Sequence, residues 1–298
     1  METIEFSVIT TVLNEAKTIK ALLDSLAKQT LAPKEIVITD AGSTDGTITI
    51  INQWRERHKE IPVRLVGVPT ANRSQGRNRA ITEAKQEYLA VIDAGCTAES
   101  HWLARLAKTY QETGAEAVAG FYLTRPKNIW ERIFSLYLAV QPKDFDPKTY
   151  LPSSRSLSLT KTAWKKAGKY PEKLNTCEDL VLAQRLKAKT KMVATAKACV
   201  YWQLPRTGSE FFKAIAGYAQ GDVEARYRPH LIKMLTVYGR YLVFIVAPWL
   251  FLLYLLYPQF KFIRVLPLPD LCLTSVVQIM ADVAVMWGGI KGGLSQNR

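Results

Sequence analysis

The chain has 298 residues, enough for one large or two modest domains, and its hydrophobic (48%) and charged (22%) contents are ordinary for a folded protein. Its 40 Lys and Arg residues against 26 Asp and Glu residues give a net charge of +14. Such an excess of positive charge is typical of proteins that bind nucleic acid, an anionic membrane surface or a phosphorylated substrate. No RNP, zinc-finger or helix-turn-helix pattern favours nucleic acid. Four scattered cysteines without a C-x-x-C pair argue against a zinc site or disulfide framework and indicate a reducing compartment.

The N-terminal part of the chain alternates between predicted strands and helices. Short apolar runs rich in Val, Ile and Thr predict buried strands, and apolar residues at helical spacing predict the helices between them. Strands are expected at 6–12, 35–40, 63–66 and 88–92, and helices at 16–29 and 47–57. Residues 72–80 are expected to form a polar, very basic loop that runs into a helix ending near residue 86. This alternation is typical of βαβ units and predicts an α/β fold with a mostly parallel central sheet flanked by helices.

The next part of the chain continues the mixture of strands and helices. Strands are expected at 115–123, 153–159 and 198–202, and helices at 102–113, 161–167, 180–186 and 211–226. The segment 130–140 is apolar and aromatic, with Arg132 inside it and Lys127 and Lys143 on either side. Two interpretations remain open for that segment: a helix in the protein core, or a helix that lies on a lipid surface.

Near the C-terminus, an uncharged apolar run of 17 residues covers 241–257. Extended back to residue 235, the run has about the length of 20 residues that spans a bilayer, and its Trp and Tyr residues suit the interfaces. A second candidate, 271–290, contains Asp282 and a glycine pair. A buried helix pair is the alternative. We expect a catalytic domain at 1–228 and a membrane region at 229–298 with one or two transmembrane helices, at about 235–257 and 271–290.

The basic residues around the first apolar run bear on its orientation. Arg226, Arg228 and Lys233 precede the run, which indicates a cytoplasmic side there. Lys261 and Arg264 follow it in the connecting loop, so the rule that positive charge stays inside is not cleanly satisfied. The N-terminus is acidic and enters a strand directly, which is not the pattern of a signal peptide.

Polar residues gather at the ends of successive predicted strands. Open α/β sheets bind ligands at the carboxyl ends of their strands, so these residues are expected to share one crevice. Asp40 can accept hydrogen bonds from a base or ribose, and Arg73, Arg77 and Asn78 can hold a diphosphate. Asp93 can bind a divalent cation that neutralises the diphosphate. Each acid taken singly also fits an ordinary helix cap or turn.

The motifs at these strand ends resemble those of the family 2 glycosyltransferases, which have the GT-A fold. The resemblance covers about residues 5–225, in the order of the family. Five stretches carry it, at 7–15, 37–47, 73–80, 91–95 and 177–180. It implies a nucleotide-diphospho-sugar transferase fold with C-terminal hydrophobic helices.

The resemblance also implies roles for individual residues. Asp179, paired with Glu178, is the implied catalytic base that takes a proton from the acceptor hydroxyl. Asp93 matches the first acid of the family's metal motif, but its second acid is replaced by Gly95, which leaves a Mg²⁺ or Mn²⁺ requirement open. Residues expected at the donor are Thr11, Asn14, Glu15, Asp40, Ser43, Asp45, Arg73, Arg77, Asn78, Asp93 and Arg206, and those expected at the acceptor are Arg155 and Trp202.

These features together predict an inverting glycosyltransferase that uses a nucleotide-diphosphate sugar. The acceptor is expected to be lipid-linked or a membrane-proximal saccharide, with no nucleic acid partner. The enzyme is expected at the inner cell membrane, with its catalytic domain in the cytoplasm. A membrane-anchored pseudo-transferase or scaffold is the alternative that Gly95 supports, and a nucleotidyltransferase is disfavoured because no Gly-rich activating loop occurs near the N-terminus.

Overall fold

The computed structural model describes residues 4–295, which divide into two compact units. The first unit comprises the described residues up to Arg125 together with Gln141–Gln203, and the second comprises Pro126–Val140 together with the residues from Leu204 onward. This division differs from the boundary expected at residue 228. Helices α5 (Ile129–Leu138) and α8 (Gly208–Glu224) belong to the second unit because their apolar side chains pack with the C-terminal helices.

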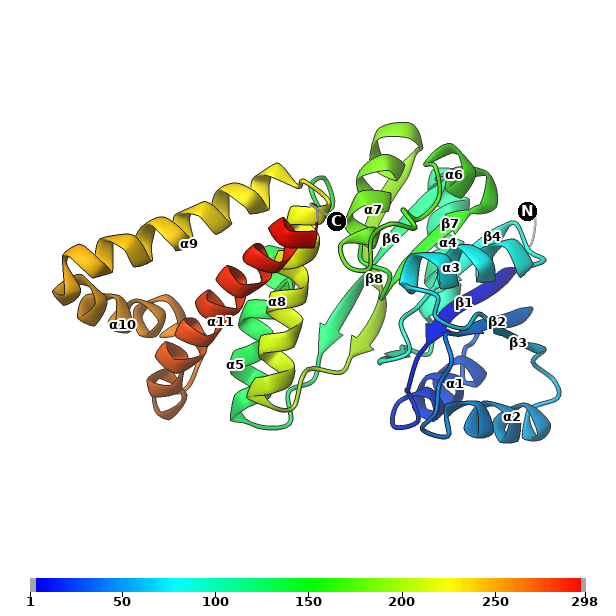
Figure 1. The fold of residues 1–298 in the computed structure, drawn as a ribbon. Helices are drawn as coiled ribbons and strands as arrows, with labels where there is room; N and C mark the ends of the chain where they lie inside the picture. The colour runs from blue at the N-terminus through cyan, green and yellow to red at the C-terminus, as the bar shows by residue number, and fades with distance from the viewer. Residues whose placement is uncertain (1–3, 296–298) are drawn as a thin grey trace. The chain divides into compact units, whose positions relative to one another are not determined.

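The first unit is built on a sheet that, within residues 4–295, contains eight strands in the order β3-β2-β1-β4-β7-β6-β8-β5 (Figure 1). The strands are β1 (Phe6–Val12), β2 (Glu35–Asp40), β3 (Val63–Gly67), β4 (Tyr88–Val91), β5 (Cys96–Ala98), β6 (Ala117–Thr124), β7 (Leu157–Thr160) and β8 (Met192–Trp202). Strands β3, β2, β1 and β4 are parallel to one another, whereas β7 is antiparallel to both β4 and β6. The expected mostly parallel sheet therefore occurs in one half, and the other half is mixed.

Helices cover the sheet of the first unit. They are α1 (Ile19–Ala27), α2 (Thr47–Arg57), α3 (Arg73–Glu83), α4 (Trp102–Thr113), α6 (Lys161–Lys166) and α7 (Glu178–Lys189), with a 3₁₀ turn η1 at Pro142–Asp144. Helix α1 buries Ile19, Leu22, Leu23 and Leu26, the helical spacing that predicted it. Helix α3 begins at a capping box in which the side chains of Asn72 and Gln75 each accept a backbone N–H of the other residue.

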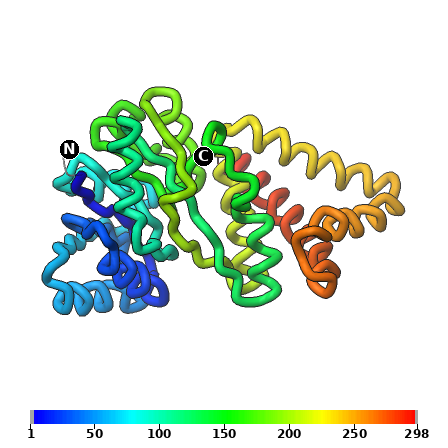
Figure 2. The backbone as a smooth tube through the Cα atoms, turned by 180° about the vertical axis from the view of Figure 1, so that it is seen from behind, coloured from blue at the N-terminus to red at the C-terminus, as the bar shows by residue number. Residues whose placement is uncertain are grey.

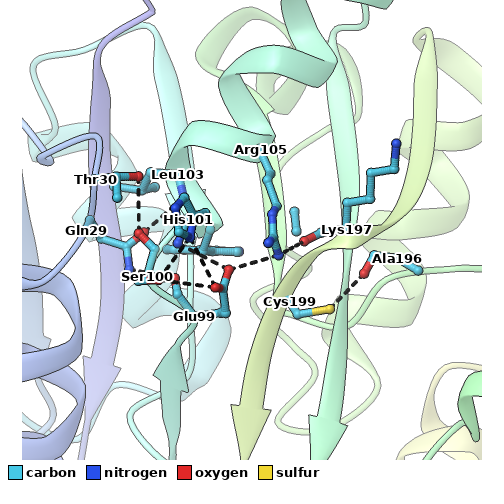
Figure 3. A network of polar contacts seen from close by, with 12 residues as sticks. Gln29, Thr30, Glu99, Ser100, His101, Leu103, Arg105, Ala196, Lys197 and Cys199 are labelled. Carbon is cyan, nitrogen blue, oxygen red and sulfur yellow. Dashed lines mark hydrogen bonds and ion pairs between the residues drawn. The ribbon is translucent and has the colours of Figure 1, made fainter.

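A polar network joins the turn between β5 and α4 to the loop after α1 and to β8 (Figure 3). The Gln29 side chain donates to the Glu99 carbonyl at 2.8 Å and accepts from the Leu103 N–H at 3.0 Å. Arg105 pairs with the Glu99 carboxylate at 2.9 Å and donates to the Lys197 carbonyl at 2.7 Å. These contacts hold the short strand β5, whose three residues give no periodic signal in the sequence.

The middle of the sheet packs tightly around Ser156. Trp102 Nε1 donates to the Ser156 hydroxyl at 3.0 Å, and that hydroxyl donates to the Ala198 carbonyl at 3.2 Å. Gly120 lies at an irregularity between β6 and β8, where a Cβ atom would fall 2.0 Å from Ser156 Oγ and 2.8 Å from the Ala198 oxygen. Glycine is therefore required at position 120 by lack of space.

The second unit is entirely helical in the described residues, with α9 (Arg228–Val246), α10 (Pro248–Phe262) and α11 (Leu268–Ser295) following α5 and α8. Its core contains Ile133 and Phe134 of α5, Phe211 of α8, and Val277 and Ala281 of α11. The segment 130–140 is thus a core helix of this unit. By length and composition, α11 is the one helix among residues 4–295 that is long and apolar enough to cross a bilayer, and 39% of its most apolar window is buried.

The apolar run expected as a single helix over 235–257 is two helices. Helix α9 ends at Val246, and α10 begins at Pro248. Ala247 between them has φ −130° and ψ 76°, because a residue that precedes proline is disfavoured in the helical region. Figure 2 shows α9 in yellow and α10 in orange meeting at this turn.

Replacement of Gly120 by alanine tests the packing around Ser156. The added methyl group has no space, so Gly120→Ala is expected to lower the free energy of unfolding by about 1–3 kcal/mol. That change corresponds to a fall of several degrees in the thermal midpoint. Gly67→Ala is the matched control, because a Cβ there meets nothing within 4 Å. Equal thermal midpoints for the two variants would contradict the packing described.

Candidate functional site

A crevice lies at the carboxyl ends of β1, β2 and β4, where the chain order in the sheet reverses. Strands β2 and β3 extend from one side of β1 and β4 pairs on the other side, the arrangement at which open α/β sheets bind ligands. A cavity of about 250 Å³ opens there. Its lining residues are Thr11, Val12, Leu13, Glu15, Thr39, Ala41, Val68, Ala71, Asn72, Arg73, Gly76 and Asn175.

The loops after β1 and β2 are joined by hydrogen bonds. Asn14 N–H donates to the Ser43 hydroxyl at 2.9 Å, and the Asn14 side-chain oxygen accepts from the Thr44 N–H at 2.9 Å. The Asp45 carboxylate accepts from the Ala16 N–H at 3.0 Å. Asn14, Ser43 and Asp45, all expected at the donor, therefore have a visible role in shaping the rim of the crevice.

Asp40 ends β2, and only 3% of the residue is exposed. Its carboxylate accepts from the Gly42 N–H at 2.9 Å and from the Ser43 N–H at 3.0 Å. This is the aspartate turn in which a side chain holds its own following backbone. The contacts of Asp40 thus fix the loop, and its expected contact with a nucleotide base stays a prediction.

A buried arginine joins the end of β4 to the start of α7. The Arg77 side chain is 5% exposed, and its guanidinium donates to Asp93 Oδ1 at 2.7 Å and to Glu178 Oε1 at 2.5 Å. The same group lies 5.3 Å from the centre of the Tyr170 ring. Two carboxylates and an aromatic face are what a buried guanidinium needs, since an unpaired buried charge is costly. Arg77 therefore brings two acidic segments of the chain into one site.

These contacts set the ionisation of the acids. Burial by itself raises the pKa of Asp93, but the nearby cations Arg77, Arg155 and Arg73 outweigh it and hold that pKa below its usual value. Burial raises the pKa of Glu178, opposed by Arg77 and reinforced by Asp179. Burial also raises the pKa of Glu15, although a hydrogen bond from Thr18 opposes it. Of Asp93, Glu178 and Glu15, Asp93 is the acid whose pKa is lowered.

The pair Glu178 and Asp179 forms the first turn of α7, where the helix dipole favours negative charge. The Asp179 carboxylate accepts from the Leu180 N–H at 2.8 Å and from the Ser154 N–H at 3.4 Å. Cys177, immediately before the pair, has a left-handed backbone with φ 61°. Such strain in a residue other than glycine is concentrated at functional sites. The sharp turn at Cys177 places both acids side by side at the start of α7.

A second arginine lies between aromatic rings close to Asp93. The Arg155 guanidinium is 3.9 Å from the centre of the Trp202 ring and 5.0 Å from that of Tyr122. Its charge lowers the pKa of Asp93. Stacking on the two rings holds the Arg155 guanidinium in place, and a guanidinium held in this way can bind an anion. Arg155 and Trp202, both expected at the acceptor, are thus in contact with each other.

Three residues expected at the donor differ in their surroundings. Both amide donors and both acceptor positions of Asn78 are used within the protein, by Tyr170, Glu172 and Trp164. Arg206 belongs to the second unit, and its backbone N–H donates to Glu210 at 2.7 Å. Arg73 is exposed and lines the cavity. The contact of each of the three with the donor stays a prediction.

Sequence reasoning overlooked Thr39 and Tyr170. Thr39 lines the cavity, and its buried hydroxyl has no hydrogen-bond partner among the described residues, which leaves a donor and an acceptor for a ligand. Its polar side chain within an apolar strand was the available signal. Tyr170 contacts Arg77 and, through its hydroxyl at 2.9 Å, Ser154. No local sequence pattern marks Tyr170.

The residues that could hold a metal are few. No group of three His, Cys, Asp or Glu side chains within residues 4–295 could hold an ion. The Asp93 side chain is 33% exposed, however, and Gly95 leaves open space where the family has a second acid. One carboxylate together with the phosphates of a ligand is a donor set that Mg²⁺ and Mn²⁺ accept. The site therefore fits a cation that arrives with a diphosphate and does not fit one held by the protein alone.

Comparisons with known proteins agree with this geometry. Residues 7–155 match the family model described as Glycosyl transferase family 2. The chain is 32% identical over 117 residues to glycosyltransferase AglE of Haloferax volcanii, a match that covers 38% of this chain and 38% of that protein. The chain thus spans less than half the length of this curated relative.

Two solved structures share the fold. Mannosyltransferase PcManGT from Pyrobaculum calidifontis, in complex with GDP-Man and Mn²⁺, superimposes with a TM-score of 0.62 at 18% identity, over 97% of this chain and 86% of that one. Residues 1–349 of TarS from Staphylococcus aureus, in complex with UDP-GlcNAc, give a TM-score of 0.54 at 19% identity, over 72% of this chain and 66% of that one. The expected GT-A fold is confirmed.

Removal of the Arg77 guanidinium tests the central contact of the site. Arg77→Leu leaves the buried carboxylate of Glu178 and the partly exposed carboxylate of Asp93 without their cation, so the free energy of unfolding at neutral pH is expected to fall by about 3–5 kcal/mol. Arg79→Leu on the same helix is the control. Arg79 is 54% exposed in its pair with Glu83, so its loss is expected to cost about 0–1 kcal/mol.

The pH dependence of the same variant separates charge from packing. In the wild type the lowered pKa of Asp93 adds stability that is present above its unfolded pKa of about 3.9 and is lost as the pH falls through the folded pKa. Burial raises the pKa of Glu178 even with Arg77 present, and the pKa values of both acids are expected to rise without it, so Arg77→Leu is expected to gain stability as the pH is lowered from 8 to 5. Urea unfolding at both pH values measures this, and a deficit independent of pH would contradict it.

Proposed function

The chain belongs to glycosyl transferase family 2, and on this premise we propose that it is an inverting transferase that moves a sugar from a nucleotide-diphosphate donor to a hydroxyl group. The observation that carries the proposal is the Arg77 bridge between Asp93 and Glu178. The bridge joins the end of β4, expected at the donor diphosphate, to the start of α7, expected at the acceptor. A transferase needs both substrates at one point.

In this proposal the donor occupies the crevice at the ends of β1 and β2. The nucleoside enters the 250 Å³ cavity, where the free hydroxyl of Thr39 and the carboxylate of Glu15 offer polar contacts. Arg73 supplies positive charge to the diphosphate, in a bidentate geometry that a guanidinium group allows. Arg155, expected at the acceptor, lies close enough to Asp93 to add to that positive charge. PcManGT and TarS, which share this fold, are complexed with GDP-Man and UDP-GlcNAc. A UDP- or GDP-sugar is accordingly the proposed donor.

Asp179 acts as the general base in this proposal. Its carboxylate takes the proton of the acceptor hydroxyl while the oxygen forms a bond to the anomeric carbon. The bond between that carbon and the diphosphate oxygen breaks on the opposite face, and the nucleoside diphosphate leaves. A single displacement of this kind inverts the anomeric configuration. Glu178 holds Arg77, and Arg77 in turn keeps the negative charge of Asp93 fixed beside the leaving group.

Asp93 is the residue that would hold a divalent cation together with the donor phosphates. When bound, Mg²⁺ or Mn²⁺ supplies positive charge that stabilises the leaving diphosphate. Among the chain's own residues, Arg155 and Arg73 already lower the pKa of Asp93 and add to the positive charge at the same place. The ionised carboxylate of Asp93 is therefore ready to act as a ligand at any physiological pH.

The proposed acceptor is lipid-linked or is a saccharide near a membrane, and the proposed location is the cytoplasmic face of the inner cell membrane. The net charge of +14 and the exposed apolar side chains of α9 and α10 support this part of the proposal. A membrane-anchored protein that binds nucleotide sugars without transferring them is the second candidate. The absence of a second acid at Gly95 favours that candidate.

Asp179→Asn tests the proposed base. The amide cannot accept the proton, so sugar transfer is expected to fall by about 10²–10⁴-fold, while donor binding measured by calorimetry stays within a few-fold of wild type. Transfer is measured with a panel of UDP- and GDP-sugars as the release of nucleoside diphosphate. Asp144→Asn, an exposed acid in η1, is the matched control and is expected to be fully active.

Two results would count against this mechanism. Undiminished turnover by Asp179→Asn would remove Asp179 as the base. A wild type that is inert toward the whole panel, both with and without Mn²⁺, and that nevertheless binds a nucleotide sugar, would favour the non-catalytic candidate.

Asp93→Asn tests the expected metal ligand through binding alone. Mn²⁺ is expected to strengthen the binding of UDP or GDP to the wild type at least about tenfold, because the cation links Asp93 to the diphosphate. The same addition is expected to have little effect in Asp93→Asn and its full effect in Asp144→Asn. If Mn²⁺ leaves the binding of UDP and GDP to the wild type unchanged, the arginines carry the diphosphate charge and the metal assignment is wrong.

A further inference from the structure

The turn between α9 and α10 exposes a continuous set of large apolar side chains. Val246 is 86% exposed, Ile245 is 76% exposed and Trp249 is 62% exposed. Leu242, Val243, Leu252 and Leu253 are also exposed. Soluble surfaces rarely expose so many adjacent apolar groups unless they meet another phase or partner. We call residues 242–253 the apolar tip.

The exposed side chains near the end of α9 form one broad face. Residues 242, 243, 245 and 246 are all exposed, and at 100° per residue they span an arc of about 160°. On α10, the exposed side chains of Trp249, Leu252 and Leu253 continue the apolar surface. An exposed apolar surface on two neighbouring helices with no charged residue between 241 and 260 is of the kind that enters a lipid phase.

A polar cluster lies at the base of the apolar tip, and exposed apolar residues such as Leu235 and Phe260 continue beyond it on both arms. Asp282 of α11 is 3% exposed and accepts from Arg240 at 3.0 Å and Tyr241 at 3.2 Å on α9, and from Tyr254 at 2.6 Å on α10. Gln278 donates a further hydrogen bond at 3.0 Å. The acid is therefore satisfied within the protein and fastens both arms of the hairpin to α11. From Arg240 in the cluster to Val246, six residue steps extend about 9 Å along α9.

Basic residues flank the apolar tip on both arms. No acidic residue occurs between Glu224 and Asp270, while six basic residues do: Arg226, Arg228, Lys233, Arg240, Lys261 and Arg264. All except the half-buried Arg240 are exposed. Residues 241–260 between them carry no charge. An apolar tip between two basic stretches is complementary to a membrane surface with anionic headgroups.

Helix α11 is held along α8 by close backbone contact. A Cβ atom at Gly288 would lie 2.2 Å from the Ala216 carbonyl oxygen, and one at Gly292 would lie 2.8 Å from the Gln220 carbonyl oxygen. Helix α8 carries Glu210, Lys213 and Glu224, which do not suit a hydrocarbon environment. The C-terminal half of α11 thus packs on a polar helix of its own unit, which disfavours α11 as a membrane span.

We propose that the α9–α10 hairpin enters one leaflet of an anionic membrane with its apolar tip and returns to the side from which it came. This rests on the membrane association in the proposed function and specifies its form. A reach of about 9 Å beyond the polar cluster fits within one leaflet, which is half of a hydrocarbon core about 30 Å thick. Both basic stretches then lie on the same membrane side.

The experiment compares label access at three positions of the full chain bound to sealed phosphatidylglycerol–phosphatidylcholine vesicles. Cysteines are introduced singly as Thr236→Cys before the tip, Val246→Cys within it and Ile263→Cys after it. The accessible Cys177 and Cys272 are replaced by serine. A membrane-impermeant maleimide added outside is expected to label positions 236 and 263 and to leave 246 protected. Protection of 263 from the label would mean that the run crosses the bilayer, which would overturn the proposal.

The strength of vesicle binding supplies a second readout. Val246→Asp is expected to weaken co-flotation with these vesicles at least about tenfold and to leave the thermal midpoint unchanged, because the side chain is exposed. Ile48→Asp, at an exposed apolar residue of α2, is the matched control. Binding to vesicles of pure phosphatidylcholine is expected to be clearly weaker than to the anionic vesicles.

Two further results would contradict the proposal. A chain that ignores vesicles and forms a dimer in solution that Val246→Asp dissociates would assign the tip to a second copy. Equal binding by Val246→Asp and the wild type would show that the tip does not enter lipid. These measurements use no sugar donor, so failure of the proposed transfer chemistry would leave their outcome unchanged.

Discussion

One buried cation holds the candidate site together. The Arg77 guanidinium is removed from water, and its ion pairs with Asp93 and Glu178 offset the free-energy cost of that burial. Because Asp93 follows β4 and Glu178 begins α7, their shared cation fixes the start of α7 against the sheet. The next residue, Asp179, takes its position from the same turn. Arg77 therefore fixes the direction of Asp179, and together with Arg155 and Arg73 it lowers the pKa of Asp93.

The elements that sequence periodicity predicted are those whose burial is regular along the chain. Strands β1 and β2 are almost wholly buried, so they appear as unbroken apolar runs, and the apolar face of α1 repeats at helical spacing. Strand β5 has three residues and exists because it pairs with the end of β8. The middle of β8 is exposed and carries no alternation. Partners distant in sequence define these two strands, and local pattern does not reveal such partners.

The candidate site was predictable in its residue types and less so in their roles. Reasoning from strand ends selected Glu15, Arg73 and Asp93, which lie around one crevice. It also selected Asn78, whose amide is fully used by the protein. Binding a ligand and holding the protein together require the same polar groups. Only the three-dimensional contacts show which of these groups already have hydrogen-bond partners within the protein. Thr39 illustrates the converse, because a threonine in a strand looks ordinary until its hydroxyl is found without a partner.

A hydropathy profile counts apolar residues along the chain and does not show where the chain turns back. The run 241–257 has the length of a membrane span, yet Ala247 and Pro248 turn it back on itself. Asp282 fitted poorly within the second candidate span at 271–290, and Lys261 and Arg264 fitted poorly in the loop after the first. Asp282 fastens the two arms of the hairpin, and a chain that returns to its starting side keeps Lys261 and Arg264 on the same membrane side as Arg240. Asp282 and Lys261, which are hard to reconcile with membrane-spanning helices, are thus both accounted for by a hairpin.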